Sequence, residues 1–251
     1  MDDGAPGLSD RSLEGIMGRL APEAYYQSPG GRRFLIAAAL IANVPRGARV
    51  LDVECGIGPA AVDIAEAFGC KVVAFDNYAP YLAFGRQNAA GRGVGKQVSF
   101  RPLDGIAAVT AFEAGSFDLV LGLGGAMSDT IPGGLRGGFG AAAAWSKPGG
   151  YLICGELVTP GTPSELMRVV FGESLHGEAE FLATLNEAGF DLAFAARATG
   201  SDWDEMRATM NLLRDRSLDL GPPEERQRQR LTEAARNHPE VAYLNVLARK
   251  R

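Results

Sequence analysis

The sequence predicts an α/β fold built on one doubly wound, mostly parallel sheet with helical cap elements. Three observations predict it. Apolar runs of strand length alternate with helical segments along the chain, which is typical of strand–helix–strand units. The first, second, fourth and fifth of these runs are almost continuously apolar, as expected of strands that are covered on both faces. A glycine-rich turn joins the first run to a helix.

The sequence predicts seven strands, with helices between them. They are placed near residues 48–53, 71–75, 97–101, 117–122, 150–157, 190–196 and 241–248. Ahead of the first strand, Ser9 is expected to cap a short helix that ends near Leu20. A second helix is expected over residues 32–43, because its apolar side chains recur at helical spacing. The helix after the glycine-rich turn is expected over residues 59–68.

The domain organisation is interpreted as a tail followed by one domain. Residues 1–8 are acidic and contain Gly and Pro, so we expect them to be disordered. Residues 9–251 form the domain, and its N-terminal helices occupy 9–45. An insert at 201–237 carries two expected helices, which is more than a minimal crossover needs. It is a candidate cap over a substrate, and Ser201 is the expected N-cap of its first helix.

The glycine-rich turn is the most informative feature of the chain. The first strand ends at Asp52, and the chain then runs through Glu54, Cys55, Gly56, Ile57 and Gly58 into the helix. Glycine at such a turn lets backbone N–H groups approach a ligand, because no Cβ is in the way. The helix N-terminus adds partial positive charge. By itself this pattern fits a dinucleotide, a phosphate or only a close strand–helix contact.

A second acid narrows the choice of ligand. The second strand ends at Asp76, and an acid in this place can accept hydrogen bonds from both hydroxyls of a ribose. A carboxylate at Asp52 would repel a pyrophosphate. The two acids therefore indicate an adenosine ligand that also carries a cationic group.

Five segments in order give the chain its family resemblance. They are Val50 to Gly58, Asp76, Leu103-Asp104, Phe117-Asp118-Leu119-Val120, and Lys147-Pro148-Gly149-Gly150-Tyr151-Leu152. In this pattern the chain resembles the class I S-adenosylmethionine-dependent methyltransferases, in their small-molecule branch, from about Tyr25 to Arg249. The resemblance implies a Rossmann-like methyltransferase fold, the cofactor S-adenosyl-L-methionine and a small-molecule methyl acceptor. A homodimer is one further expectation.

The resemblance also implies a set of cofactor contacts. Asp104 lies where the family places an acid that faces the adenine amino group, and Gln27 lies in a loop that covers the methionine tail in similar proteins. The full set of candidate cofactor-binding residues is Asp52, Glu54, Cys55, Gly56, Gly58, Asp76, Asn77, Asp104, Gln27 and Gly122. Glu54 departs from the pattern, because the family usually has glycine or another small residue there. Its carboxylate could clash with the cofactor or bind the cofactor's amino group.

A catalytic base is not required by the expected chemistry. The sulfonium already makes the methyl group electrophilic, so the protein mainly aligns the nucleophile and excludes water. The candidates for a base are Glu156, Asp129, His176, Tyr25 and Tyr26. Glu156 ends the fifth strand, and a helix-capping role is an equally good interpretation. The glycine-rich run 122–134 follows the fourth strand at the edge where ligands bind in open α/β sheets.

The cap has two interpretations. Trp203, Met206, Met210 and Leu213 recur at helical spacing and form one apolar stripe. The stripe can pack on the sheet edge as core. Alternatively, its upper part, Trp203 and Met206, faces the site with Tyr25 and Tyr26 and shapes an apolar acceptor pocket.

Composition and motifs weigh against several other functions. The net charge of −5 disfavours nucleic acid and anionic membranes as partners. A protein or nucleic-acid methyltransferase and a degenerate cofactor-binding protein of the same fold are the alternatives. An NAD-binding oxidoreductase is disfavoured by the lack of a full G-x-G-x-x-G.

Cys55, Cys70 and Cys154 form no C-x-x-C and indicate reduced thiols in the cytoplasm. The two histidines have no metal-ligand spacing, so no metal is expected.

Overall fold

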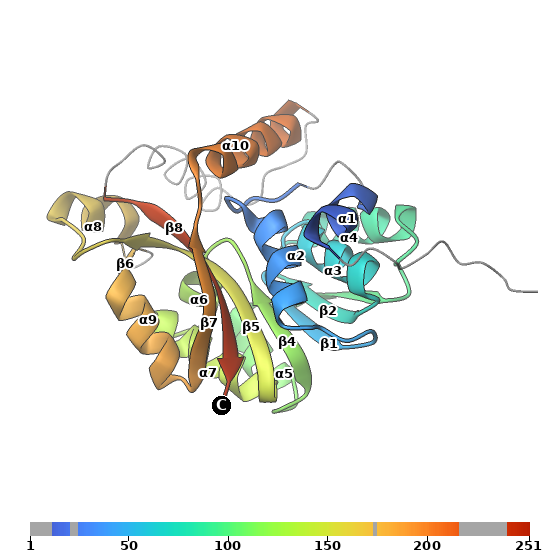
Figure 1. Ribbon diagram of the computed structural model, residues 1–251, viewed down its shortest axis with the longest axis horizontal. Coiled ribbons are helices and arrows are strands. Elements are labelled where there is room, and N and C mark those ends of the chain that lie inside the picture. Colours follow the sequence, from blue (N-terminus) through green and yellow to red (C-terminus); the bar gives the residue numbers. More distant parts are fainter. Residues whose placement is uncertain (1–11, 21–24, 173–174, 216–239) are drawn as a thin grey trace, which may run out of the picture.

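The computed structural model describes residues 12–20, 25–172, 175–215 and 240–251 (Figure 1). The tail at 1–8, the cap residue Ser9 and the predicted helix at 222–237 lie outside these ranges. No helix in the described ranges combines the length and apolar character that a membrane crossing needs.

The sheet has the predicted doubly wound, mostly parallel character. Its strands are β1 (Arg49–Val53), β2 (Lys71–Asp76), β3 (Val98–Pro102), β4 (Phe117–Gly122), β5 (Ser146–Thr159), β6 (His176–Gly177), β7 (Phe190–Arg197) and β8 (Ala242–Lys250). Their order is β3-β2-β1-β4-β5-β8-β7, and β6 pairs with the end of β5. The strands from β3 to β5 are parallel, whereas β8 is antiparallel to both β5 and β7. The seven predicted strands are confirmed, and only the two-residue β6 was not predicted.

Helices cover both faces of the sheet (Figure 1). They are α1 (Leu13–Arg19), α2 (Gly31–Ile41), α3 (Pro59–Phe68), α4 (Ala79–Gly91), α5 (Gly105–Ala111), α6 (Ala126–Asp129), α7 (Gly134–Trp145), α8 (Glu165–Phe171), α9 (Glu178–Glu187) and α10 (Gly200–Asp215). In one core cluster, the helices α1, α2, α3 and α4 pack on one face of the sheet. A second joins α5, α6, α7 and α9 to the other face. Burial on both faces explains the continuous apolar runs of the parallel strands.

A third apolar cluster lies at the carboxyl edge of the parallel strands, apart from the two sheet-face cores. It joins Ile57 after β1, Leu157 at the end of β5 and Tyr243 at the start of β8 to the buried side of α10. Figure 1 shows α10 beyond this edge of the sheet. The cap helix therefore covers the edge where ligands bind in this class of fold.

The first helix that the structure describes begins at Leu13, and its N-cap is Ser12, whose Oγ accepts the Gly15 N–H at 3.0 Å. The predicted cap Ser9 lies outside the described residues. The predicted start of the cap helix is wrong. The helix α10 begins at Gly200, so Ser201 lies inside it and Thr199 precedes it. The Thr199 N–H donates to Asp202 Oδ2 at 2.7 Å, and Asp202 N lies 3.4 Å from Thr199 Oγ1. This reciprocal pair resembles a capping box and outcompetes a cap at Ser201.

Candidate cofactor and acceptor site

The turn after β1 has a strained backbone. Glu54, Gly56 and Gly58 all have positive φ, at 51°, 55° and 77°. Such a conformation is ordinary for glycine and unfavourable for a side chain with a Cβ. A Cβ at Gly58 would lie 2.5 Å from the Phe100 ring, so close packing also requires glycine there. Glu54 adopts this backbone although it has a Cβ, and it stands at the position where the sequence departs from the pattern that it otherwise resembles.

Asp76 holds the turn in place. Its Oδ2 accepts the Gly56 N–H at 2.9 Å, and its Oδ1 accepts the Tyr78 N–H at 2.8 Å. Only 5% of the residue is exposed. Each carboxylate oxygen can accept more than one hydrogen bond, so these two contacts do not prevent bonds from ligand hydroxyls. The predicted ribose-binding acid thus lies directly beside the predicted glycine turn.

Asp52 is a buried carboxylate at the end of β1. Burial raises its pKa from the ordinary 3.8 to about 7; a hydrogen bond from the Ala61 backbone opposes this rise, and the charge of Asp76 adds to it. Its Oδ2 is buried and has no hydrogen-bond partner in the structure. An orphaned carboxylate oxygen is costly to bury. A cationic or hydrogen-bond-donating ligand group would relieve that cost.

Gln27 lies against the same turn. A Cβ on Gly56 would be 3.4 Å from Gln27 Oε1, and Gln27 Nε2 is buried without a hydrogen-bond partner. The structure therefore brings Asp52, Gly56, Asp76 and Gln27 together, and their role in cofactor binding stays a prediction. Asp52 and Gln27 each carry a buried polar atom without a hydrogen-bond partner, which fits a ligand with both donor and acceptor groups.

The other predicted cofactor residues lie around this group. Asp104 is exposed and caps α5, because its Oδ1 accepts the Ala107 N–H at 2.7 Å. Asn77 is exposed after β2, and Cys55 is buried in the turn. Gly122 ends β4, and a Cβ there would collide with the Met127 side chain. Roles for these residues in cofactor binding stay predictions.

Glu156 has the contacts of a helix cap. It is 1% exposed and accepts the Met127 N–H at 2.9 Å and the Ser128 hydroxyl at 2.8 Å. These bonds satisfy donors at the first turn of α6. Its oxygens are therefore engaged in holding the loop after β4, and its role as a base stays a prediction.

The remaining base candidates lie in different surroundings. Asp129 is exposed and accepts the Ser128 hydroxyl at 3.1 Å. His176 is half-buried in β6. Tyr25 belongs to the third apolar cluster, whereas Tyr26 belongs to the sheet-face core that holds α2 and α3. Of the two tyrosines, the structure therefore places Tyr25 in the cluster that contains the cap helix.

The apolar stripe of α10 is buried within the third cluster. Trp203, Met206, Met210 and Leu213 are each at most 5% exposed. The Trp203 ring packs edge-on against Tyr243, with 6.2 Å between the ring centroids. The Tyr243 hydroxyl accepts the Gly124 N–H at 2.7 Å and donates to the Gly155 carbonyl at 2.8 Å. Trp203 is thus connected to the glycine-rich loop after β4. It shares its cluster with Tyr25, whereas Tyr26 belongs to the sheet-face core.

Sequence reasoning missed a buried ionic cluster centred on Asp63. This residue of α3 is fully buried, and its carboxylate binds Arg32 at 2.9 Å, Arg92 at 2.6 Å and the Tyr26 hydroxyl at 3.1 Å. The available signal was a carboxylate inside the apolar helix run Ala-Ala-Val-Asp-Ile-Ala. A buried charge needs partners, but no local pattern in the sequence identifies which residues they are.

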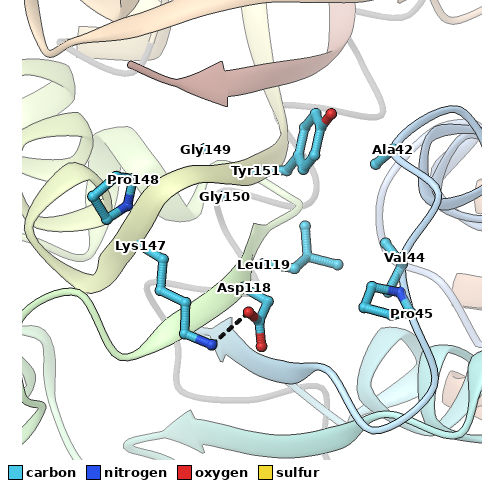
Figure 2. A pocket seen from close by; sticks show the side chains of 10 residues that line it. All are labelled: Ala42, Val44, Pro45, Asp118, Leu119, Lys147, Pro148, Gly149, Gly150 and Tyr151. Atoms are coloured by element: carbon cyan, nitrogen blue, oxygen red, sulfur yellow. Dashed lines mark hydrogen bonds and ion pairs between the residues drawn. The ribbon is translucent and has the colours of Figure 1, made fainter.

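A separate hollow lies at the opposite edge of the sheet. Its volume is about 180 Å³, and Figure 2 shows its lining, which includes the Asp118–Lys147 ion pair at 2.5 Å. It is formed by the loop before β1 and the starts of β4 and β5. Ligands in parallel α/β sheets bind at the carboxyl edge, so this hollow is not part of the site. The described residues contain no group of three or more His, Cys, Asp or Glu side chains able to hold a metal.

Comparison with known proteins finds a methyltransferase domain in the chain. Residues 50–150 match the family described as "Methyltransferase domain". A relative from Triticum aestivum, phosphoethanolamine N-methyltransferase 1, is 30% identical over 158 residues, which is 59% of this chain and 29% of the relative. The chain spans only 29% and 37% of the two curated relatives it matches.

Two solved structures share the fold over nearly the whole chain. A methyltransferase from Thiobacillus denitrificans, solved with S-adenosyl-L-homocysteine, has a TM-score of 0.71 at 22% identity and covers 95% of this chain and 98% of its own. The [4+2]-cyclase SpnF has a TM-score of 0.67 at 20% identity and covers 95% and 91%. At 22% and 20% identity, these similarities show a shared fold and nothing about activity.

Proposed function

Because residues 50–150 match the family described as "Methyltransferase domain", we propose that the protein is a class I S-adenosylmethionine-dependent methyltransferase that transfers a methyl group from S-adenosyl-L-methionine to a small-molecule acceptor. The buried Asp52 Oδ2, which has no hydrogen-bond partner and lies beside the glycine turn, is the observation that carries the proposal. An adenosine ligand with a cationic amino-acid tail supplies the complementary groups. The observed turn geometry and the fold of the solved neighbours support the same conclusion.

The residues that would hold the cofactor have distinct tasks. Asp76 would accept hydrogen bonds from the ribose and already fixes the Gly56 backbone. Asp52 and Gln27 would bind the amino-acid tail. When bound, the cofactor supplies a methyl group on a positively charged sulfur. The protein would orient the acceptor and exclude water, tasks for which the buried cap cluster is suited.

We propose an acceptor with an apolar body. The third cluster, as far as the structure describes it, consists of aromatic, aliphatic and methionine side chains. Such a lining suits flat or aliphatic ligands, because methionine adapts its shape and aromatic rings supply large contact areas. The Triticum aestivum relatives are named for phosphoethanolamine, a charged acceptor. The described cap therefore supports a different acceptor chemistry.

Shortening Trp203 tests the acceptor proposal. We expect Trp203→Phe to raise the KM for the acceptor about tenfold, the effect of about 1.4 kcal/mol of lost contact, with the cofactor Kd unchanged. Initial rates and calorimetry measure the two constants once a screen for labelled methyl uptake has identified an acceptor. Leu213→Ala, at the far end of the same stripe, is the control and should lower the melting temperature without raising KM. An unchanged KM in folded Trp203→Phe removes Trp203 from the site.

A cofactor-binding protein that does not transfer a methyl group is the second candidate. The specific observation is Glu54, which carries charge and an unfavourable φ of 51° into the turn. The fold neighbour SpnF is named as a cyclase, so this fold serves other chemistry as well. Labelled methyl transfer separates the two candidates, because only a methyltransferase moves the label to an acceptor.

Replacing Glu54 by glycine tests the role of its carboxylate. We expect Glu54→Gly to stabilise the free protein by about 1 kcal/mol, because glycine relieves the left-handed backbone. We expect cofactor affinity to fall or stay level, since the carboxylate is proposed to lie within reach of the cofactor's amino group. Thermal unfolding and calorimetry measure both quantities. Binding that appears only in Glu54→Gly would identify the natural chain as a degenerate member.

Two further expectations stay proposals. The three cysteines are free and buried, which supports a reducing compartment such as the cytoplasm. A homodimer is proposed from the family resemblance alone, and its mass in solution tests it.

A further inference from the structure

We propose that Asp63 is a positioning residue that fixes the segment at residues 26–32 over the cofactor turn. The inference deepens the proposed function and rests on it. The segment runs from the loop that precedes α2 into the first turn of that helix. It carries Gln27, the side chain that lies against Gly56.

One carboxylate receives both ends of the segment. At its start, the Tyr26 hydroxyl donates to Asp63 Oδ2 at 3.1 Å. At its end, Arg32 Nε donates to the same oxygen at 2.9 Å, and Arg32 Nη2 lies 3.4 Å from Oδ1. All three side chains are buried, so water competes little for these bonds. The path of residues 27–31 is therefore bounded at both ends by a single group on α3.

The middle of the segment has its own attachment. Asn245 Nδ2 on β8 donates to the Pro29 carbonyl at 3.2 Å. Between this bond and Tyr26, Gln27 places its Oε1 against the Gly56 turn and leaves its Nε2 buried without a hydrogen-bond partner. An amide that is held in place with a free donor is preorganised for a ligand acceptor, and preorganisation lowers the entropic cost of binding.

The charge of Asp63 is needed for this arrangement. Asp63 faces two guanidinium groups, those of Arg32 and Arg92. Removing the shared carboxylate would leave both cations buried without this negative charge, which is costly. Burial, and next the charge of Asp63, raise the pKa of Tyr26 well above its ordinary value, so its hydroxyl stays protonated and donates. The loss of Asp63 would thus release both ends of the segment together.

The segment also touches the cap. A Cβ on Gly30 would lie 3.1 Å from Asp202 Cγ, in the first turn of α10. Because Gly30 has no Cβ, its backbone can pass close to that side chain, and its positive φ of 68° also favours glycine. The position of residues 26–32 therefore affects both the cofactor turn and the start of the acceptor-covering helix.

The inference is tested with the full chain and S-adenosyl-L-homocysteine as the probe. Asp63→Asn should lower affinity about ten- to a hundredfold, the range for lost hydrogen bonds to a charged group. Tyr26→Phe removes one donor only, and should lower affinity about threefold without preventing folding. Glu66→Gln is the matched control, because Glu66 also binds Arg92 but makes no described contact with residues 26–32. It should leave affinity unchanged.

A double-mutant cycle distinguishes positioning from general stabilisation. If Asp63 acts through Gln27, the effect of Asp63→Asn on affinity should disappear in a Gln27→Ala background. Additive losses in the cycle would overturn the inference. If Asp63→Asn does not fold, the cycle is measured with Tyr26→Phe and Gln27→Ala, and additive losses of affinity would again overturn the inference.

Amide hydrogen exchange in the free protein provides a readout that does not depend on the cofactor. Exchange at residues 27–31 should accelerate at least tenfold in Asp63→Asn and Tyr26→Phe, while exchange in β4 stays at the natural rate. Natural exchange rates at residues 27–31 in both variants would overturn the inference. Failure of the natural protein to bind the probe would instead contradict the proposed function.

Discussion

Asp76→Ala is expected to weaken S-adenosyl-L-methionine binding by at least about 1.5–3 kcal/mol, the contribution of hydrogen bonds to a charged group. The expected loss is large because the carboxylate has two tasks. It would accept the ribose hydroxyls, and in the free protein it already accepts the backbone N–H groups of Gly56 and Tyr78 at 2.9 and 2.8 Å. Alanine removes the ligand contact and releases the turn that presents the ligand-facing backbone. Calorimetric titration measures the loss.

A second variant separates these two tasks. Asp76→Asn keeps the shape and one carbonyl acceptor for a backbone N–H, but lacks the charge, so we expect an intermediate affinity. Circular dichroism checks that both variants are folded. Natural affinity in a folded Asp76→Ala protein would remove Asp76 from the cofactor site and would contradict the resemblance on which the site was predicted.

The fold was predictable because its signals are local. Strand periodicity and strand–helix alternation placed the seven main strands within a few residues. Pro59 and Gly69, at the two ends of α3, explain why that helix was predicted with its exact bounds. Proline suits the first helical turn, and glycine suits the left-handed residue after the last. The start of α10 was wrong because Thr199 and Ser201 are both good caps, and only tertiary placement selects between them.

The site was predictable where it follows from topology. Asp52 and Asp76 end neighbouring parallel strands, so the carboxyl edge brings them together whatever the side-chain details. The partners of Asp63 were not predictable in the same way. Arg32 and Arg92 lie 31 residues before and 29 residues after it, and their meeting depends on how α2 and α4 pack around α3. The same holds for Glu156, whose capping contacts depend on the path of the loop after β4.

The pKa of Asp52 gives the free protein a specific pH dependence. The folded-state pKa is raised to about 7 from an ordinary 3.8. Between these values the folded protein holds a proton that the unfolded chain has lost. The contribution of protonated Asp52 to the free energy of unfolding is therefore fully present below about pH 4, decreases as the pH rises to 7, and is absent above pH 7. The shift corresponds to about 4 kcal/mol at 1.36 kcal/mol per pKa unit.

Asp52→Asn isolates this contribution. Asparagine is close in shape and never ionises, so the stability of the variant relative to the natural protein should increase by about 2–3 kcal/mol as the pH rises from 5 to 8. Denaturant unfolding across this range measures the difference, and subtraction cancels the titration of all other groups. A difference that does not change with pH would show that the buried carboxylate keeps an ordinary pKa.

Cofactor binding should offset the free-energy cost of holding Asp52 ionised in the protein interior. A cationic amino group near Asp52 favours the ionised carboxylate and lowers its pKa. Binding at pH 6 should then release a proton, and affinity should rise up to about tenfold per pH unit below 7 and level off above it. Calorimetry in two buffers of different ionisation enthalpy measures the proton directly. Asp52→Asn should release none and should lose affinity mainly above pH 7, where the natural carboxylate carries its charge. The same pH slope in both proteins would mean that another group takes the cation. The buried acid would then be a cost of the fold with no part in binding.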